Sequence, residues 1–191
     1  MTAADEFRAL DLRCHTLLRD APLHDVWVID LAGGGSGRTM RDVDAIAAPE
    51  RARPAPIIVR ALFALRFALG RVFGWDRPAR APHVHSYLRR LTDEDRARSL
   101  VPPGTARGIF RLLYLFADEA VAETRNATVH AFLAMALRPR PDGYRLYWAV
   151  YVKPVGRLTA VYMAAIDPFR RLLVYPALIR ETKAAWARAY A

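Results

Sequence analysis

His130 is the first candidate for acid–base chemistry, because the histidine side chain titrates near neutral pH. It stands beside Phe132 in a segment that alternates like a strand, and Asp118, Glu119 and Glu123 are acidic residues that could pair with it. A general acid or base needs a partner within hydrogen-bond reach, but no spacing in the sequence identifies a catalytic pair. His130 is therefore a weak catalytic candidate, and a hydrogen bond to a neighbour at the sheet surface is the competing interpretation.

Metal ligation has little support in the sequence. His83 and His85 are two residues apart, so in a strand both imidazoles would point the same way, as metal sites require. No third ligand is evident nearby, and the pair stands in a proline-rich stretch, which favours a solvated pair. Cys14 is the only cysteine and excludes both a disulfide framework and a cysteine-based zinc site. We expect no metal and no other cofactor.

The glycine-rich segment 32–39 imitates a phosphate-binding loop, because it follows a predicted strand. The lysine of such a loop is absent, Arg38 is a fork-shaped donor, and Ala32 replaces the first glycine. A phosphate-binding loop also belongs to a parallel sheet with crossover helices, which the closely spaced strands of 110–153 lack. We predict an ordinary flexible loop.

An apolar stripe is the candidate site on which the functional prediction rests. Apolar pockets with a few placed hydroxyl groups are the usual small-molecule sites. Tyr114, Tyr151 and Tyr162 could supply hydroxyls, and Arg66 could anchor an acidic head group. The competing interpretation is that the stripe is simply hydrophobic core. Its members are Phe116, Leu133, Met135, Trp148, Val150 and Tyr162.

Four strand candidates in quick succession predict an antiparallel sheet that carries this stripe. Asp142–Gly143 supplies the backbone freedom that a tight turn between the last two strands needs. In both of those strands one face is wholly apolar and the other is mixed, as expected of a sheet covered on one side. The four segments are Phe110–Phe116, Glu119–Thr124, Ala127–Arg138 and Tyr144–Lys153.

Helices with apolar residues at three- and four-residue spacing are expected to cover the sheet. One is Ile57–Phe73, and another begins within 158–166. Asp167 and Pro168 then predict a helix start, with an apolar stripe that continues to Trp186 and a kink or break at Pro176. The fold class is therefore α+β, a twisted antiparallel sheet gripping a long, Pro-kinked C-terminal helix.

The first half of the chain contributes less regular structure. Residues 5–18 favour a short helix, Asp25–Leu31 has the β-branched and aromatic content of a strand, and residues 77–107 are mainly loop. Thr92 predicts the N-cap of a short helix within that loop. At 191 residues we expect a single domain, 1–191.

Composition excludes several function classes. The net charge is +10, from 29 basic and 19 acidic residues, but the arginines are dispersed and no nucleic-acid-binding motif is present. We therefore expect no nucleic-acid partner. No apolar run reaches the length of about 18 residues that a transmembrane helix needs, and no signal peptide is visible. A cytoplasmic protein without integral membrane association is the expectation.

Five groups of short strings are distinctive: His24–Trp27, Leu65–Phe67 with Gly70 and Phe73–Gly74, Thr128–Phe132, Gly156–Arg157 with Tyr162–Met163, and Asp167–Arg171. Over roughly residues 10–182 they resemble a bacterial family known only as a domain of unknown function. The family occurs alone or fused behind an NAD(P)-binding domain similar to the short-chain dehydrogenases. The resemblance implies a START-like (SRPBCC, helix-grip) fold with a cavity between sheet and C-terminal helix, and it implies no catalytic residue.

Three functions are open at this stage. The first is a non-catalytic domain that binds a hydrophobic or amphipathic small molecule in such a cavity. The second is an enzyme of the cyclase or dehydratase type in the same place, with His130, Tyr162 or Arg66 polarising a carbonyl group. The third is an interaction module for a redox partner, which rests only on the fusions seen in the resembling family. A homodimer stays open in each case.

Overall fold

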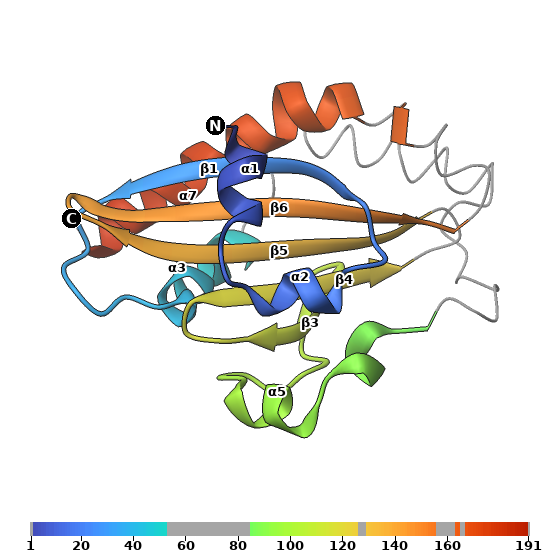
Figure 1. Cartoon of the computed structure of the whole chain (residues 1–191). Coiled ribbons are helices and arrows are strands. Elements are labelled where there is room, and N and C mark those ends of the chain that lie inside the picture. Colours follow the sequence, from blue (N-terminus) through green and yellow to red (C-terminus); the bar gives the residue numbers. More distant parts are fainter. Residues whose placement is uncertain (1, 53–84, 126–128, 156–162, 165–166, 191) are drawn as a thin grey trace.

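The computed structural model describes residues 2–52, 85–125, 129–155, 163–164 and 167–190, and within them one six-stranded antiparallel sheet organises the chain (Figure 1). The strand order is β1-β6-β5-β4-β3-β2, so the first strand lies beside the last. The strands are β1 (Leu23–Ala32), β2 (Ala106–Arg107), β3 (Phe110–Leu115), β4 (Glu119–Arg125), β5 (Val129–Arg140) and β6 (Gly143–Pro154).

The long β5–β6 hairpin forms at the turn that the sequence predicts. Its register pairs Arg140 with Gly143 at the turn and Val129 with Pro154 at the open end. Gly143 has φ +139°, and a Cβ atom on it would lie 2.2 Å from the carbonyl oxygen of Leu31. Both the backbone conformation and the contact with β1 therefore require glycine here.

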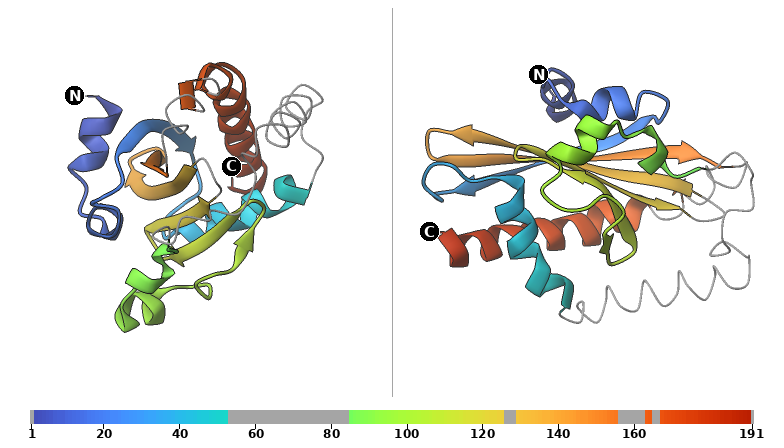
Figure 2. Two further views of the ribbon diagram at one scale, coloured as in Figure 1. Left: turned by 90° about the vertical axis from the view of Figure 1, so that its right-hand side faces the viewer. Right: turned by 90° about the horizontal axis from the view of Figure 1, so that it is seen from below.

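Helices lie on both faces of the sheet, as the two views of Figure 2 show. α1 (Ala3–Arg8), α2 (Arg13–Leu17) and the 3-10 turn η1 (Tyr87–Arg90) pack on one face, which we call the N-terminal face. α3 (Met40–Ala52) and α7 (Tyr175–Tyr190) pack on the other, the C-terminal face. The expectation of a sheet covered on one side is therefore wrong.

Helices also cover the N-terminal face because this face, which the sequence analysis describes as mixed, carries large apolar side chains. Phe132 on β5 and Tyr147 and Tyr151 on β6 are almost completely buried, and Phe7 and Leu17 of the N-terminal helices pack against this side. Leaving these rings in water would be unfavourable, since burying an aromatic side chain contributes about 1.5–3 kcal/mol.

α5 (Asp93–Arg98) begins after the predicted N-cap Thr92, whose hydroxyl accepts a hydrogen bond from the Asp95 N–H.

The C-terminal helix contains a π-helical turn, η2 (Arg170–Val174), directly before α7. The Tyr175 N–H donates to the Arg170 carbonyl five residues earlier. Pro176 follows and has no N–H to give the carbonyl four residues back. The wider turn changes the bonding pattern just before this proline, and the helix continues to Tyr190. The predicted irregularity therefore takes the form of a π turn.

Other predictions have mixed outcomes. The predicted helix 57–73 lies outside the described residues, as does most of 158–166. The N-terminal helical segment is two short helices rather than one. No helix in the described part of the chain has the length and apolar character needed to cross a bilayer.

Candidate functional site

Four members of the predicted stripe lie together on the C-terminal face. Leu133 pairs with Val150 and Met135 with Trp148 across β5 and β6, so their side chains form one patch in the middle of the sheet. All four are only partly buried, although they occupy the two central strands. This patch faces α7, and it contains the predicted site residues that the described structure brings together.

Phe116 and Tyr114 do not belong to this patch, which corrects the sequence prediction. They are stacked on each other, with ring centroids 4.2 Å apart, in the core of the N-terminal face. The cause is an irregularity in β3: Leu112 pairs with Ala122 but Tyr114 with Val121, so one extra residue reverses the alternation beyond it. Tyr151 also lies on the N-terminal face.

Arg66 and Tyr162, the other two predicted ligand contacts, lie outside the described residues, as does His83. Among the residues that the structure does describe, no group of three or more His, Cys, Asp or Glu side chains could hold a metal ion.

His130 is enclosed in the core of the N-terminal face rather than exposed at the sheet surface. Its Nε2 lies 2.9 Å from Glu123 Oε2, and both side chains are 1% exposed. Glu123 also accepts hydrogen bonds from the Tyr87 N–H, at 3.0 Å, and from the Ser86 hydroxyl. Burial raises the pKa of Glu123, but the hydrogen bonds from His130 and Ser86 outweigh it and leave that pKa below its usual value. This network favours the structural interpretation of His130.

The glycine-rich loop is held in place by the end of the C-terminal helix. The Trp186 indole donates to the Ala32 carbonyl at 3.1 Å, and a Cβ atom on Gly34 would lie 2.8 Å from that indole ring. Arg38 donates to the Gly34 carbonyl and forms an ion pair with Asp42. Arg38 therefore has partners within the protein, and the loop is tied to α7 rather than being the flexible loop that the sequence predicts.

A β-bulge in β1 brings two further residues to the patch, Asp25 and Trp27, which the sequence prediction did not include. Leu23 pairs with Tyr151, but Asp25 pairs with Val150, so β1 has one residue more than β6 at this point. The bulge reverses the alternation: Leu23 packs on the N-terminal face, whereas Asp25 and Trp27 are paired with C-terminal-face residues of β6. The polarity of Asp25 within an apolar strand was the signal available in the sequence.

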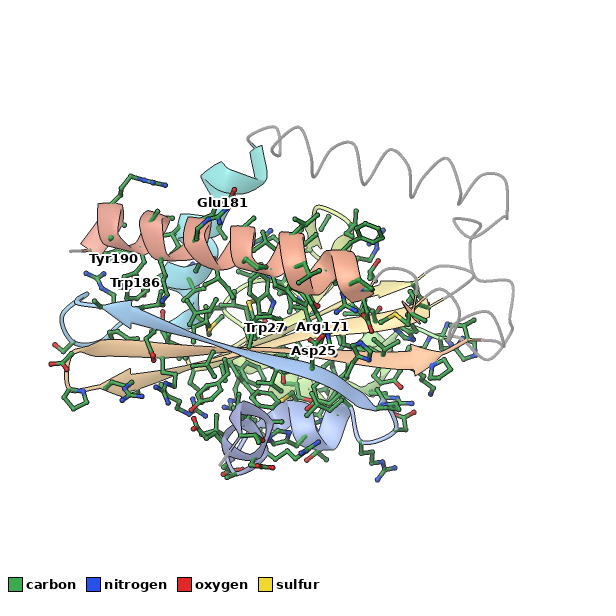
Figure 3. The ribbon with its side chains drawn as sticks, turned by 90° about the horizontal axis from the view of Figure 1, so that it is seen from above. Asp25, Trp27, Arg171, Glu181, Trp186 and Tyr190 are labelled. Carbon is green, nitrogen blue, oxygen red and sulfur yellow. The ribbon has the colours of Figure 1, made fainter. Side chains whose placement is uncertain are left out.

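Asp25, Trp27 and Trp148 adjoin one another because their strands are paired. Trp27 is the direct cross-strand partner of Trp148, and Asp25 is two residues from Trp27 on the same face. The Tyr175 ring closes this group from α7, with centroids 5.0 Å from Trp27 and 6.5 Å from Trp148. Figure 3 shows Asp25 and Trp27 between the sheet and the C-terminal helix, with Arg171 beside them.

Three buried polar groups in this cluster find no hydrogen-bond partner among the described residues. They are both carboxylate oxygens of Asp25 and the indole Nε1 of Trp27 and of Trp148. Leaving a buried donor or acceptor unpaired costs about 1–3 kcal/mol, and more for a charged group. Trp186, whose indole is paired, provides the contrast within the same face.

The charged residues around Asp25 are bound to one another. His24 Nε2 lies 2.8 Å from Asp167 Oδ2, and Arg170 donates to Asp167 Oδ1 at 2.8 Å and to the Tyr175 hydroxyl. Arg170 Nη2 comes within 3.6 Å of Asp25 Oδ2, an ion-pair separation without a hydrogen bond. Because Arg170 belongs to η2, the π turn places its guanidinium over the cluster; such turns are frequent at functional sites.

Burial sets the protonation behaviour of the cluster. It raises the pKa of Asp25, against the opposing effect of Arg170 and His24. It also raises the pKa of Tyr175 to about 12, so this phenol stays neutral. The cluster thus offers two indole donors, a carboxyl group with a raised pKa and an apolar floor. Its residues are Asp25, Trp27, Leu133, Met135, Trp148, Val150 and Tyr175, and we call it the α7-facing cluster.

Fold and site define the class of protein: an α+β domain whose six-stranded antiparallel sheet, counted over the described residues, is covered on one face by a C-terminal helix. A family model described as "Protein of unknown function (DUF2867)" matches residues 17–177. The chain belongs to this family. No curated protein and no solved structure matches the chain.

Proposed function

We propose that the protein binds a hydrophobic or amphipathic small molecule between the sheet and the C-terminal helix, in a START-like helix-grip arrangement. The observation that carries the proposal is the pair of buried indole N–H groups of Trp27 and Trp148, neither of which has an acceptor among the described residues. A protein that only needed to fill its core could place phenylalanine or leucine at these positions and avoid the cost. A ligand oxygen would supply the missing acceptors.

The packing of the same strands on their two sides supports the proposal. Phe132 and Ala134, which point to the N-terminal face, are 0% and 1% exposed. Their neighbours Leu133 and Met135, which point to α7, are only partly buried. Apolar side chains that are incompletely covered beneath a helix can gain contacts from a ligand, and a few fixed polar groups then orient it.

N-phenyl-1-naphthylamine, a neutral apolar dye that emits in apolar surroundings, tests this function. We expect saturable binding of one dye per chain, with emission sensitised by excitation of the tryptophans. Replacing Trp148 with Ala should abolish this uptake. Trp186→Phe is the matched control, because it alters a paired indole on the same face and should leave dye binding intact.

Circular dichroism and thermal melting must show that both variants are folded. If Trp148→Ala does not fold, Trp148→Phe takes its place and should weaken dye binding. Absence of saturable binding to the wild type, or equal binding by wild type and the folded Trp148 variant, would refute the proposal.

Asp25 favours a second function, acid–base catalysis of the cyclase or dehydratase type in the same place. A buried carboxyl group with a raised pKa beside neutral Tyr175 could exchange a proton with a bound carbonyl compound. Turnover of an aromatic polyketone substrate that vanishes in Asp25→Asn, while dye binding persists, would support catalysis. Unchanged turnover in Asp25→Asn would exclude Asp25 as the acid or base.

A further inference from the structure

The unpaired carboxylate of Asp25 narrows the chemistry of the ligand. Both of its oxygens lack a hydrogen-bond donor among the described residues, and its side chain is 11% exposed. The nearest cation, Arg170, already donates to Asp167 and to the Tyr175 hydroxyl. A molecule bound beside Asp25 could supply the hydrogen-bond donor that the described residues do not.

The neighbours of Asp25 need the opposite partner. Trp27 lies two residues from Asp25 on the same strand and face, and Trp148 is the cross-strand partner of Trp27, so the three side chains extend from adjacent positions of the sheet. An indole N–H is a donor only and requires an acceptor. A group that satisfies both sides of this polar cluster must donate and accept at once.

Charge decides which such group fits. Asp25 and Asp167 lie beside Arg170 and the exposed Arg171, and His24 is bound to Asp167, so the surroundings contain acidic and basic side chains together. A ligand carboxylate would be repelled by Asp25, and the guanidinium that could neutralise it is already bound. A ligand ammonium would meet Arg170 and Arg171. An uncharged group avoids both penalties.

We propose that the α7-facing cluster selects an uncharged, largely apolar molecule with a hydroxyl group, an alcohol or a phenol. The hydroxyl hydrogen is donated to Asp25, and the hydroxyl oxygen accepts from an indole N–H of Trp27 or Trp148. The apolar body lies on Leu133, Met135 and Val150. This inference rests on the proposed function and adds the substrate class.

Displacement of N-phenyl-1-naphthylamine by matched naphthalenes tests the inference. The set is 1-naphthol, 1-methoxynaphthalene, naphthalene, 1-naphthoate and 1-naphthylmethylamine at neutral pH. We expect 1-naphthol to bind about tenfold more tightly than its methyl ether, as one hydrogen bond to a charged group provides. The acid and the amine should bind more weakly than the naphthol.

Asp25→Ala should reduce the ratio between 1-naphthol and its methyl ether to about one, because the acceptor is gone. Asp25→Asn keeps a weaker acceptor and should give an intermediate ratio; it also serves if Asp25→Ala does not fold. Glu181→Gln is the control, since this carboxylate lies on the far side of α7 from Asp25 (Figure 3) and its loss should leave the ratio unchanged.

The outcomes separate the two proposals. If the dye binds but the methyl ether, the acid or the amine matches or exceeds 1-naphthol, the hydroxyl inference is wrong while the binding function stands. A preference for 1-naphthol that survives in Asp25→Ala also overturns it. If the dye itself does not bind, the proposed function fails first.

Discussion

The two faces of the sheet are built from the same strands, yet they solve the packing problem differently. On the N-terminal face the buried acidic groups Glu119 and Glu123 both have hydrogen-bond donors, and the rings of Phe7 and Phe132 are completely buried. On the C-terminal face, Asp25, Trp27 and Trp148 carry polar atoms that find no partner in the part of the chain that the structure describes, and they lie beside partly buried side chains. The buried acidic groups of the N-terminal face have their hydrogen-bond partners within the protein, whereas the polar groups of the C-terminal face are available to a ligand.

The difference teaches that burial alone does not identify a site. His130 is a buried histidine paired with a buried carboxylate, which often indicates function, but that carboxylate, Glu123, also accepts hydrogen bonds from Ser86 and the Tyr87 N–H. Asp25 is less buried and its neighbours are ordinary aromatic residues. Unsatisfied hydrogen-bonding capacity is what distinguishes the two, since native proteins leave few buried polar groups unpaired.

The largest effect should come from the N-terminal face. Phe132→Ala removes a fully buried ring that contacts Tyr87 and His130, and we expect it to lower the free energy of unfolding by about 3–5 kcal/mol. Met135→Ala, three residues along the same strand but on the other face, should cost less than half as much. Urea denaturation measures both, and equal losses would remove the contrast between the faces.

Glu123→Gln should have the next largest effect, a loss of about 2–3 kcal/mol, because it leaves His130 without its carboxylate. The pKa of Glu123 is lowered in the folded protein, so the unfolded chain takes up the proton first on acidification. Ionised Glu123 therefore stabilises the folded protein at pH values above 4.5, its ordinary pKa. This stabilisation is lost as the pH falls through the lower pKa of Glu123 in the folded state. Denaturation curves between pH 7 and pH 3 should show wild type and variant converging; a constant gap would contradict this.

Two tryptophans on the C-terminal face give a smaller and sharper contrast. Trp186→Phe breaks the hydrogen bond to Ala32 in a side chain that is 1% exposed, and it should cost about 1–2 kcal/mol. Trp148→Phe removes an indole N–H for which the described residues offer no acceptor, so its loss of packing is offset and the change should stay below about 1 kcal/mol. A larger loss in Trp148→Phe would mean that its indole has a partner in solution.

Asp25→Asn should give the smallest change, a gain of about 1 kcal/mol near neutral pH in the absence of ligand. The pKa of Asp25 is raised in the folded protein, so the folded state holds its proton to higher pH than the unfolded chain does. Wild-type stability therefore decreases as the pH rises from 3.8, the ordinary pKa of Asp25, through the raised pKa of the folded state. Asp25→Asn removes this decrease. Thermal melts from pH 4 to pH 8 measure it; a variant that is less stable than wild type at pH 7 would contradict the burial cost.

The sequence predicts the fold better than it predicts the site, and the residues show why. Alternation along Val129–Arg140 and the turn at Gly143 depend on local patterns, so the hairpin and its apolar face are predictable. The bulges near His24 and Leu113 add one residue each and reverse the alternation beyond them. They place Phe116 of the predicted stripe, together with Tyr114, on the opposite face, and they bring Asp25 to the patch. A single-residue register change leaves no periodic signal in the sequence.

The indole N–H resonances of isotopically labelled protein test the central claim most directly. The chain has four tryptophans, and Trp27→Phe, Trp148→Phe and Trp186→Phe assign the three that the structure describes. On saturation with 1-naphthol, the signal of Trp27 or of Trp148 should move downfield as that N–H group gains an acceptor, while the signal of Trp186 stays in place. Unmoved Trp27 and Trp148 signals in the presence of saturating 1-naphthol would contradict the account.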